Sequence, residues 1–127
     1  MMLKRLAFIL TASIGLAAAQ PAYASKVSDM VASYASSMQE LVGQEYDGGL
    51  KVTGVRADGE VLVIEVDGPA GWRTELDPTM IADAFASGFC QSGGEFFQTG
   101  MKIRVDTTET AGKNPFVGTP ITHCPAK

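Results

Sequence analysis

Histidine and cysteine, which supply most zinc ligands and many catalytic groups, are scarce in this chain. Its 127 residues include one histidine and two cysteines, whereas a zinc site draws three or four protein ligands mainly from these residue types. A Ser-His-Asp hydrolase would need His123 as its base, but no serine lies in a Gly-x-Ser-x-Gly elbow. The sequence therefore predicts no catalytic set, no metal site and no cofactor.

Clustered positive charge is missing as well. The chain has 10 Lys and Arg against 14 Asp and Glu, and its basic residues are scattered. Binding to nucleic acid depends on clustered Lys or Arg facing the phosphates, and anionic membranes attract the same kind of cluster. Gly93-Gly94 is followed by neither Lys-Ser nor Lys-Thr, so it is not a phosphate loop. These absences disfavour nucleic acid and anionic membranes as partners.

The chain also lacks an apolar run long enough to span a bilayer. Leu6–Ala19 is apolar or small throughout, but it is shorter than the roughly 20 residues that a bilayer requires. Two positive charges precede it, and Ala22-Tyr23-Ala24 follows as a small-x-small cleavage site. We therefore expect a secretory signal peptide over residues 1–24 and a single domain over residues 25–127. Such a protein is periplasmic or secreted, with no stable membrane insertion after cleavage.

The expected mature domain starts at Ser25 and is acidic. Cleavage there removes two of the 10 basic residues and none of the acidic ones, so the net charge changes from −4 to −6. Ala17-Ala18-Ala19 is a second possible cleavage site. No cysteine stands near either site, which argues against a lipid-anchored lipoprotein.

The most informative stretch runs from Asp77 to Cys90 and predicts a helix. Asp77 is a suitable N-cap because its carboxylate can accept hydrogen bonds from the first free amides. Pro78 suits the first helical position, where a missing N–H costs nothing. Apolar and small residues then recur on one face, which we expect to be buried: Ile81, Ala84, Phe85, Gly88 and Phe89.

Cys90 ends this helix, and the only other cysteine is Cys124. Two cysteines in an exported chain are most simply one disulfide. Closing a loop of about 35 residues would stabilise the fold by roughly 3–4 kcal/mol. The alternative is a reactive thiol, with His123 lowering the pKa of Cys124. Because the chain has no Cys-x-x-Cys motif, we predict a structural disulfide.

One further helix and four strands complete the expected elements. The helix is capped by Ser25, ends by Gly48-Gly49 and carries one apolar stripe: Val27, Val31, Tyr34, Met38 and Leu41. Asp58-Gly59 predicts a hairpin. The expected strands are Leu50–Arg56, Val61–Asp67, Met101–Asp106 and Phe116–His123, with Gly54 marking a bulge and Pro120 interrupting the last strand. The polar tract Thr107–Asn114 predicts a mobile connection.

The order of elements is α-β-β-α-β-β. It predicts an α+β fold, with a four-stranded antiparallel sheet, two helices on one face and one disulfide. The chain also resembles a group of small exported Gram-negative proteins that share this order. The resemblance covers roughly Asp77 to Cys124 and rests on Phe89-Cys90, Gly100-Met101-Lys102-Ile103 and Cys124. That group has no assigned activity, so the resemblance implies a fold and no chemistry.

Three kinds of function remain. The first, which we favour, is a periplasmic interaction or accessory module that binds a protein, for example an inhibitor or immunity-type protein. It fits the small, acidic domain and the missing catalytic set, but it leaves the partner and the oligomeric state open. The second is a small-ligand carrier with an aromatic-lined pocket between helices and sheet: Phe85, Phe89, Phe96, Phe97 and Trp72. The third is a hydrolase that uses His123.

Two surfaces are candidates for a protein partner. The sheet face turned away from the helices should carry both charges over a few aliphatic residues, as modest polar interfaces do: Val61, Val63, Glu65, Asp67, Lys102, Arg104 and Asp106. Trp72 is either an exposed binding anchor or a lid over the seam between helices and sheet, which we favour. Glu65 and Asp67 could also act as an acid–base pair or hold calcium, but a solvated face is the simpler explanation.

Overall fold

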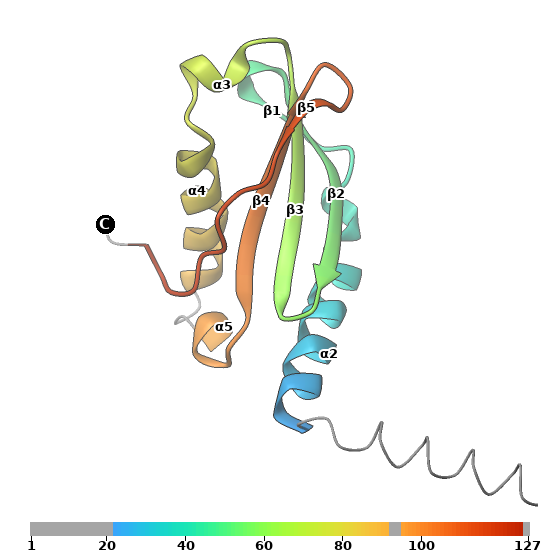
Figure 1. Cartoon of the computed structure of the whole chain (residues 1–127), viewed down its shortest axis with the longest axis vertical. Helices are drawn as coiled ribbons and strands as arrows, with labels where there is room; N and C mark the ends of the chain where they lie inside the picture. The colour runs from blue at the N-terminus through green and yellow to red at the C-terminus, as the bar shows by residue number, and fades with distance from the viewer. Residues whose placement is uncertain (1–21, 92–94, 126–127) are drawn as a thin grey trace, which may run out of the picture.

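A computed structural model describes residues 22–91 and 95–125 as an α+β fold built on one five-stranded sheet (Figure 1). The strands are β1 (Glu45–Tyr46), β2 (Leu50–Asp58), β3 (Val61–Gly68), β4 (Lys102–Glu109) and β5 (Lys113–Phe116). The helices are α2 (Ala22–Ser37), α3 (Trp72–Glu75), α4 (Pro78–Cys90) and α5 (Glu95–Gln98), with single 3-10 turns η1 (Gln39–Leu41) and η2 (Asp47–Gly49). Among the described residues, no helix combines the length and apolar character that crossing a bilayer requires.

The sheet is mixed, so the prediction of a purely antiparallel, four-stranded sheet is wrong. The strands lie in chain order, but β3 and β4 run parallel, with Val61 opposite Lys102 and Gly68 opposite Glu109. A parallel pair requires a crossover connection of a dozen or more residues. The segment between Gly68 and Lys102 is such a crossover, because it carries α3, α4 and α5.

The hairpin between β2 and β3 follows the sequence closely. Asp58 pairs with Val61, which leaves Gly59 and Glu60 as a two-residue turn. Gly59 has a φ of 60°, and this conformation suits glycine at the first turn position. The register shifts between Val52 and Gly54, which confirms the predicted bulge.

The end of the chain is more ordered than the sequence suggests. The tract Thr107–Asn114 is not a mobile connection, since its first residues continue β4 and Lys113 begins β5. The last strand is Lys113–Phe116 and not Phe116–His123. Farther along, Ile121 forms only an isolated antiparallel bridge with Ile103. β5 lies at the edge of the sheet, where a proline such as Pro115 is tolerated.

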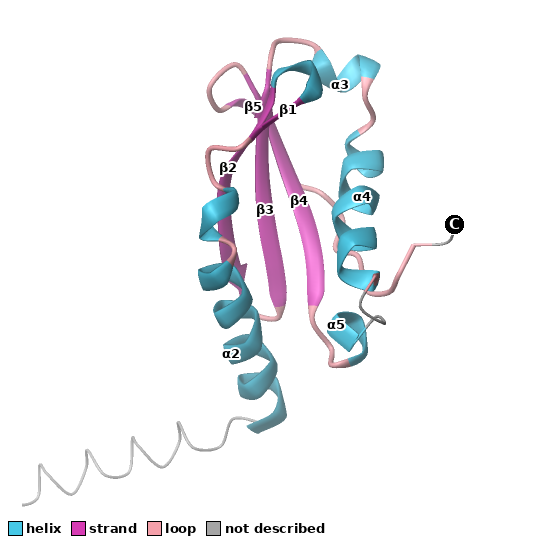
Figure 2. Ribbon diagram, turned by 180° about the vertical axis from the view of Figure 1, so that it is seen from behind, coloured by secondary structure: helices cyan, strands magenta, loops and turns pink. Residues whose placement is uncertain are grey.

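Both long helices lie on one face of the sheet (Figure 2). α2 contacts β2 and β3, whereas α4 contacts β4 and α5. The buried residues of these elements form one core with the inward side chains of the central strands, among them Leu62, Ile64 and Ile103. The predicted arrangement of two helices on one face is therefore confirmed.

The first helix begins earlier and is rotated relative to the prediction. α2 starts at Ala22, so Ser25 lies inside the helix and does not cap it; alanine, the best helix former, offers no stop signal before it. The face turned to the sheet carries Val27, Val31 and Ala35, whereas Tyr34 stays 38% exposed. The small Ala35 lets the helix approach the sheet. The rest of the expected signal peptide, residues 1–21, and Gly93-Gly94 lie outside the described residues.

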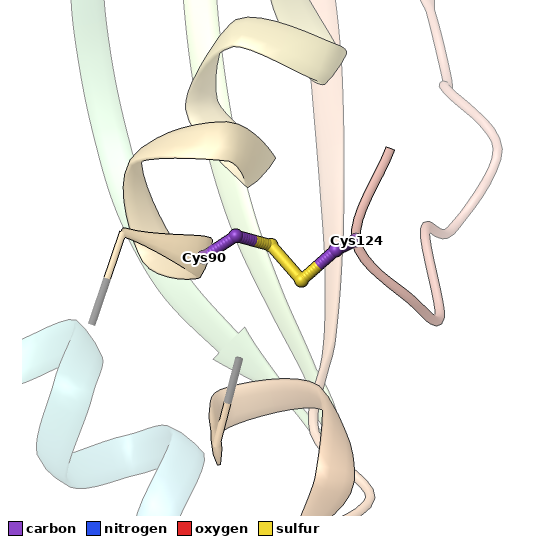
Figure 3. The surroundings of a disulfide bond; sticks show 2 residues. All are labelled: Cys90 and Cys124. Carbon is purple, nitrogen blue, oxygen red and sulfur yellow. A yellow bond between two sulfur atoms is a disulfide. The ribbon is translucent and has the colours of Figure 1, made fainter. Parts of the chain in front are cut away.

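The disulfide joins Cys90, at the end of α4, to Cys124 near the end of the chain (Figure 3). The S–S distance is 2.04 Å and the two Cα atoms lie 6.0 Å apart, within the normal range. The predicted pairing is confirmed. It attaches the segment after β5 to α4, where it runs along the outer edge of β4.

Candidate functional site

An apolar groove lies between α4 and the sheet on the described surface. It encloses about 400 Å³ and is lined by Tyr46, Leu50, Val66, Leu76, Met80, Ile81, Ala84 and Phe85. Leu50 and Val66 are buried and form its floor. The other six come from β1, from α4 and from the turn before α4. No charged side chain lines the groove.

The groove results from the way α4 packs on the sheet. The face of α4 that meets the sheet is not the one predicted. Asp77 accepts a hydrogen bond from the Thr79 amide at 2.9 Å, and Pro78 starts the helix, as expected. The buried positions, however, are Ala82 and Ala86. Small side chains let α4 lie close to β4, and this orientation turns the predicted apolar stripe toward the side.

Three residues of that stripe, Ile81, Ala84 and Phe85, form one wall of the groove. Ile81 and Phe85 pack against the core but stay half-buried, and Ala84 is exposed, so this face is partly buried and not fully buried as predicted. Met80 is 61% exposed and Tyr46, on the sheet side, is 44% exposed. Contiguous exposed apolar surface of this kind is typical of interaction sites.

The opposite sheet face carries ion pairs within the chain. Arg104 binds Asp106 through two hydrogen bonds of 2.8 Å. Lys102 Nζ lies 3.1 Å from Glu60 Oε1, and Arg56 Nε lies 3.5 Å from Glu65 Oε2. Val63 beneath them is fully buried. Three of the predicted partner-binding residues, Glu65, Lys102 and Arg104, thus lie together on this face, and each has a partner in the protein itself.

Electrostatic interactions favour the charged forms of Arg104 and Asp106 at the centre of this face. The hydrogen bond to Asp106 raises the pKa of Arg104 above its ordinary value and outweighs the opposing effect of burial. Burial raises the pKa of Asp106. Hydrogen bonds from Arg104 and from the Gly118 amide lower it by more, so the pKa of Asp106 lies below its ordinary value. Both side chains therefore remain charged over the physiological range.

Asp67, also predicted to bind a partner, holds the β4–β5 hairpin. Its carboxylate accepts hydrogen bonds from the Thr108 hydroxyl at 2.6 Å and from the amides of Ala111 and Gly112 at 3.2 and 3.0 Å. Thr110, Ala111 and Gly112 have φ values of 51°, 61° and 97°. Such backbone is unfavourable for the first two residues, and the carboxylate compensates by binding the amides that this conformation presents.

Trp72 is a lid and not an exposed anchor. Its side chain is 5% exposed, and its indole N–H donates to the Thr108 carbonyl oxygen at 2.9 Å. The neighbouring Arg73 donates to the Asn114 carbonyl oxygen at 2.7 Å and lies 3.3 Å from Glu109 Oε2. These bonds tie α3 to β4 and β5, so both residues contribute to the fold.

The aromatic residues proposed for a ligand carrier do not gather around one cavity. Phe89 and Phe96 pack with tilted rings 4.5 Å apart between centroids, and the rings of Tyr34 and Phe97 each lie 5.2 Å from that of Phe96. This cluster joins α2, α4 and α5 through mutual packing. Of the five residues proposed, only Phe85 lines the apolar groove.

The candidate catalytic and metal-binding residues lie apart. His123 is exposed beside Cys124, and its Nδ1 is 3.1 Å from the Thr122 hydroxyl. Glu65 bonds to Arg56, whereas Asp67 bonds to the hairpin. Within the described residues, no three His, Cys, Asp or Glu side chains are placed to hold a metal ion.

Three solved structures share this fold. EpsS, the pilotin of the Vibrio vulnificus type 2 secretion system, is 17% identical with a TM-score of 0.61, over 83% of this chain and 97% of EpsS. AspS, the type II secretion system pilotin of Vibrio cholerae, is 14% identical with a TM-score of 0.58, over 79% and 92%. A Pseudomonas aeruginosa protein classed as secreted is 13% identical with a TM-score of 0.62, over 76% and 88%. At these identities, the likeness is one of fold.

Sequence comparisons add nothing to this likeness. No model of a protein family matches the chain, and no curated protein sequence does.

Sequence reasoning missed the groove. Its signal was present in α4, where alanines alternate with large apolar residues around most of the helix. A helix can have one apolar face of small side chains and another of large ones. It can pack the small face on the protein core and present the large face to a partner.

Proposed function

We propose that this protein is an envelope accessory protein that works by binding a segment of another protein in the groove beside α4. The observation that carries the proposal is the partly exposed row Met80, Ile81, Ala84 and Phe85, which faces Tyr46 across an apolar floor. A stable fold gains nothing from leaving such a stripe uncovered, because burying apolar area is worth about 25 cal/mol per Å².

The comparisons support the same proposal. Two of the three similar structures are pilotins of secretion systems, and the third is a protein classed as secreted. Such a role requires no catalysis, and it agrees with a location in the periplasm or outside the cell. We extend it to this chain as a protein-binding role, with the partner unassigned.

The outer sheet face is the less favourable of the two candidate surfaces. A partner there would compete with the ion pairs of Glu65, Lys102 and Arg104 for the same charges. Arg104 also has a side chain that is only 15% exposed. That this face binds a partner stays a prediction, which charge reversal at Glu65 and Arg104 would test.

A matched pair of substitutions tests the groove. Ala84→Glu places a charge among the apolar lining, whereas Ala32→Glu makes the same change at an exposed position of α2. Both variants should fold, since exposed substitutions usually change stability by less than about 0.5 kcal/mol. We expect tagged wild-type protein and the Ala32→Glu variant to retain the same envelope protein in a pull-down, and the Ala84→Glu variant to lose it. Equal retention by all three would refute the proposed site.

A further inference from the structure

Charge is divided unequally between the strands and the helices. In the described part of the chain, four basic side chains form ion pairs: Arg56, Arg73, Lys102 and Arg104. Their acidic partners all belong to strands or to the β2–β3 turn. The acidic residues of the helices and helix caps have no ion pair within residues 22–91 and 95–125: Asp29, Glu40, Asp47, Glu75, Asp77, Asp83 and Glu95.

Little positive charge offsets these acidic residues. Lys26 and Arg73 are the only basic residues in the described helices. Lys26 belongs to the first turns of α2, at the opposite end of the molecule from α3 (Figure 2). Arg73 is bound to Glu109 and Asn114. The helix-bearing side is therefore acidic, and no ion pair within the described residues neutralises its carboxylates.

Three of these acidic residues adjoin, in sequence, residues that line the groove. Asp47 follows the groove residue Tyr46, and Glu75 and Asp77 stand on either side of the groove residue Leu76. Glu75 also lines the adjoining hollow, which shares Leu76 with the groove. All three acidic residues are exposed. We call these three residues the acidic rim of the groove, because each is exposed and adjoins a residue of the uncharged apolar lining.

We infer that the segment that occupies the groove is basic as well as apolar: a stretch of the partner protein in which apolar side chains enter the groove and Lys or Arg residues meet the rim formed by Asp47, Glu75 and Asp77. The inference rests on the proposed function and names its partner's chemistry. Complementary charge at the rim favours such a segment and repels an acidic one. An anionic lipid surface is repelled for the same reason.

Two synthetic peptides test the charge preference. Both carry leucines at positions i, i+3, i+4 and i+7, as groove-binding segments do; one has three lysines at each end and the other has three glutamates. Binding of each fluorescent peptide to the purified protein is followed by fluorescence polarisation. With three rim carboxylates, each exposed, we expect the lysine peptide to bind about tenfold more tightly than the glutamate peptide at low salt. The difference should shrink at about 0.5 M salt, because exposed charges are then screened.

Matched variants locate the effect. The rim variant combines Asp47→Asn, Glu75→Gln and Asp77→Asn, and asparagine still caps α4. The control variant removes three helix carboxylates that neither line the groove nor adjoin a residue that does, and so changes the net charge equally: Asp29→Asn, Glu40→Gln and Glu95→Gln. We expect the rim variant to lose the preference for the lysine peptide and the control variant to keep it.

The failures of the two proposals are distinguishable. Equal binding of the two peptides, equal loss in both triple variants, or binding of neither peptide would overturn the inferred basic partner while leaving the groove itself to the pull-down test. If Ala84→Glu left the binding of the lysine peptide unchanged, the peptide would not occupy the groove. The inference would then be wrong, and the pull-down would still decide the proposed site.

Discussion

Single polar side chains hold one end of this sheet together. Asp67 of β3 binds the amides at the hairpin tip, while Trp72 and Arg73 of α3 bind carbonyl oxygens of Thr108 and Asn114. Hydrogen bonds that involve a charged group are about twice as strong as neutral ones. A conspicuous charged or aromatic residue can therefore serve to stabilise the fold through internal hydrogen bonds and not to bind a partner.

The charge of Asp67 should contribute to stability in a way that depends on pH. Burial raises the pKa of Asp67, but the hydrogen bonds from Thr108, Gly112 and Ala111 lower it by more, so the pKa in the folded protein lies below 3.8. A lowered pKa means that the carboxylate stabilises the fold above pH 3.8 and loses this effect as the pH falls through the folded pKa. We expect Asp67→Asn to lower the melting temperature by a few degrees at pH 7, and by less at pH values near 2.

Thermal unfolding followed by circular dichroism at a series of pH values measures this effect. Asp29→Asn, at an exposed position of α2 without an ion pair in the described residues, is the control and should match the wild type throughout. A difference between Asp67→Asn and wild type that stayed constant or grew toward low pH would contradict the assigned role of Asp67.

Gly118 is required because the chain after β5 passes directly against β4. A Cβ atom at this position would collide with the carbonyl oxygen of Val105, and backbone in a strand cannot easily move. We expect Gly118→Ala to destabilise the fold by about 1–3 kcal/mol. Gly88→Ala is the control, since a Cβ there meets nothing within 4 Å and alanine favours a helix by about 0.5–1 kcal/mol. Urea unfolding compares the two, and equal effects would show that the close approach is unimportant.

Individual elements differ in how far local sequence determines them. The start of α4 and the β2–β3 turn could be predicted because an aspartate cap and a glycine turn act within a few residues. The disulfide could be predicted because only two cysteines were available. Which face each helix buries, and that β4 runs parallel to β3, depend on packing between distant segments. For α4 the deciding factor is the small size of Ala82 and Ala86, which a count of apolar residues undervalues.

The disulfide should stabilise one segment in particular. In the described residues, the chain near Ile121 is attached to β4 mainly by its two hydrogen bonds with Ile103, at 3.1 and 2.6 Å. We expect Cys90→Ala with Cys124→Ala to cost about 2–5 kcal/mol, which corresponds to a fall of roughly 4–8 °C in melting temperature per kcal/mol.

Hydrogen exchange separates this local effect from a general loss of stability. The Ile121 amide should exchange much faster in the double variant, whereas the amides of β3 should change only as far as global stability does. Equal acceleration of all amides would contradict a role in fastening the C-terminal segment.

The whole molecule combines an expected export signal, an acidic helix side and a groove. Cleavage after Ala24 stays a prediction, and it would leave most of α2, since that helix spans Ala22–Ser37. We expect the intact mass of protein recovered from the periplasm to correspond to a chain that starts at Ser25. A mass that includes residues 1–24, or one with an attached lipid, would contradict this processing.

Photo-crosslinking in living cells tests the central claim, that the groove binds a partner protein, most directly. A photoreactive benzoyl-phenylalanine replaces Met80, which lines the groove, or, as a control, Ala32, which is exposed on α2 and does not line the groove. We predict a covalent adduct with one envelope protein from position 80 and none from position 32. Adducts of equal yield from both positions, or from position 32 alone, would contradict the account.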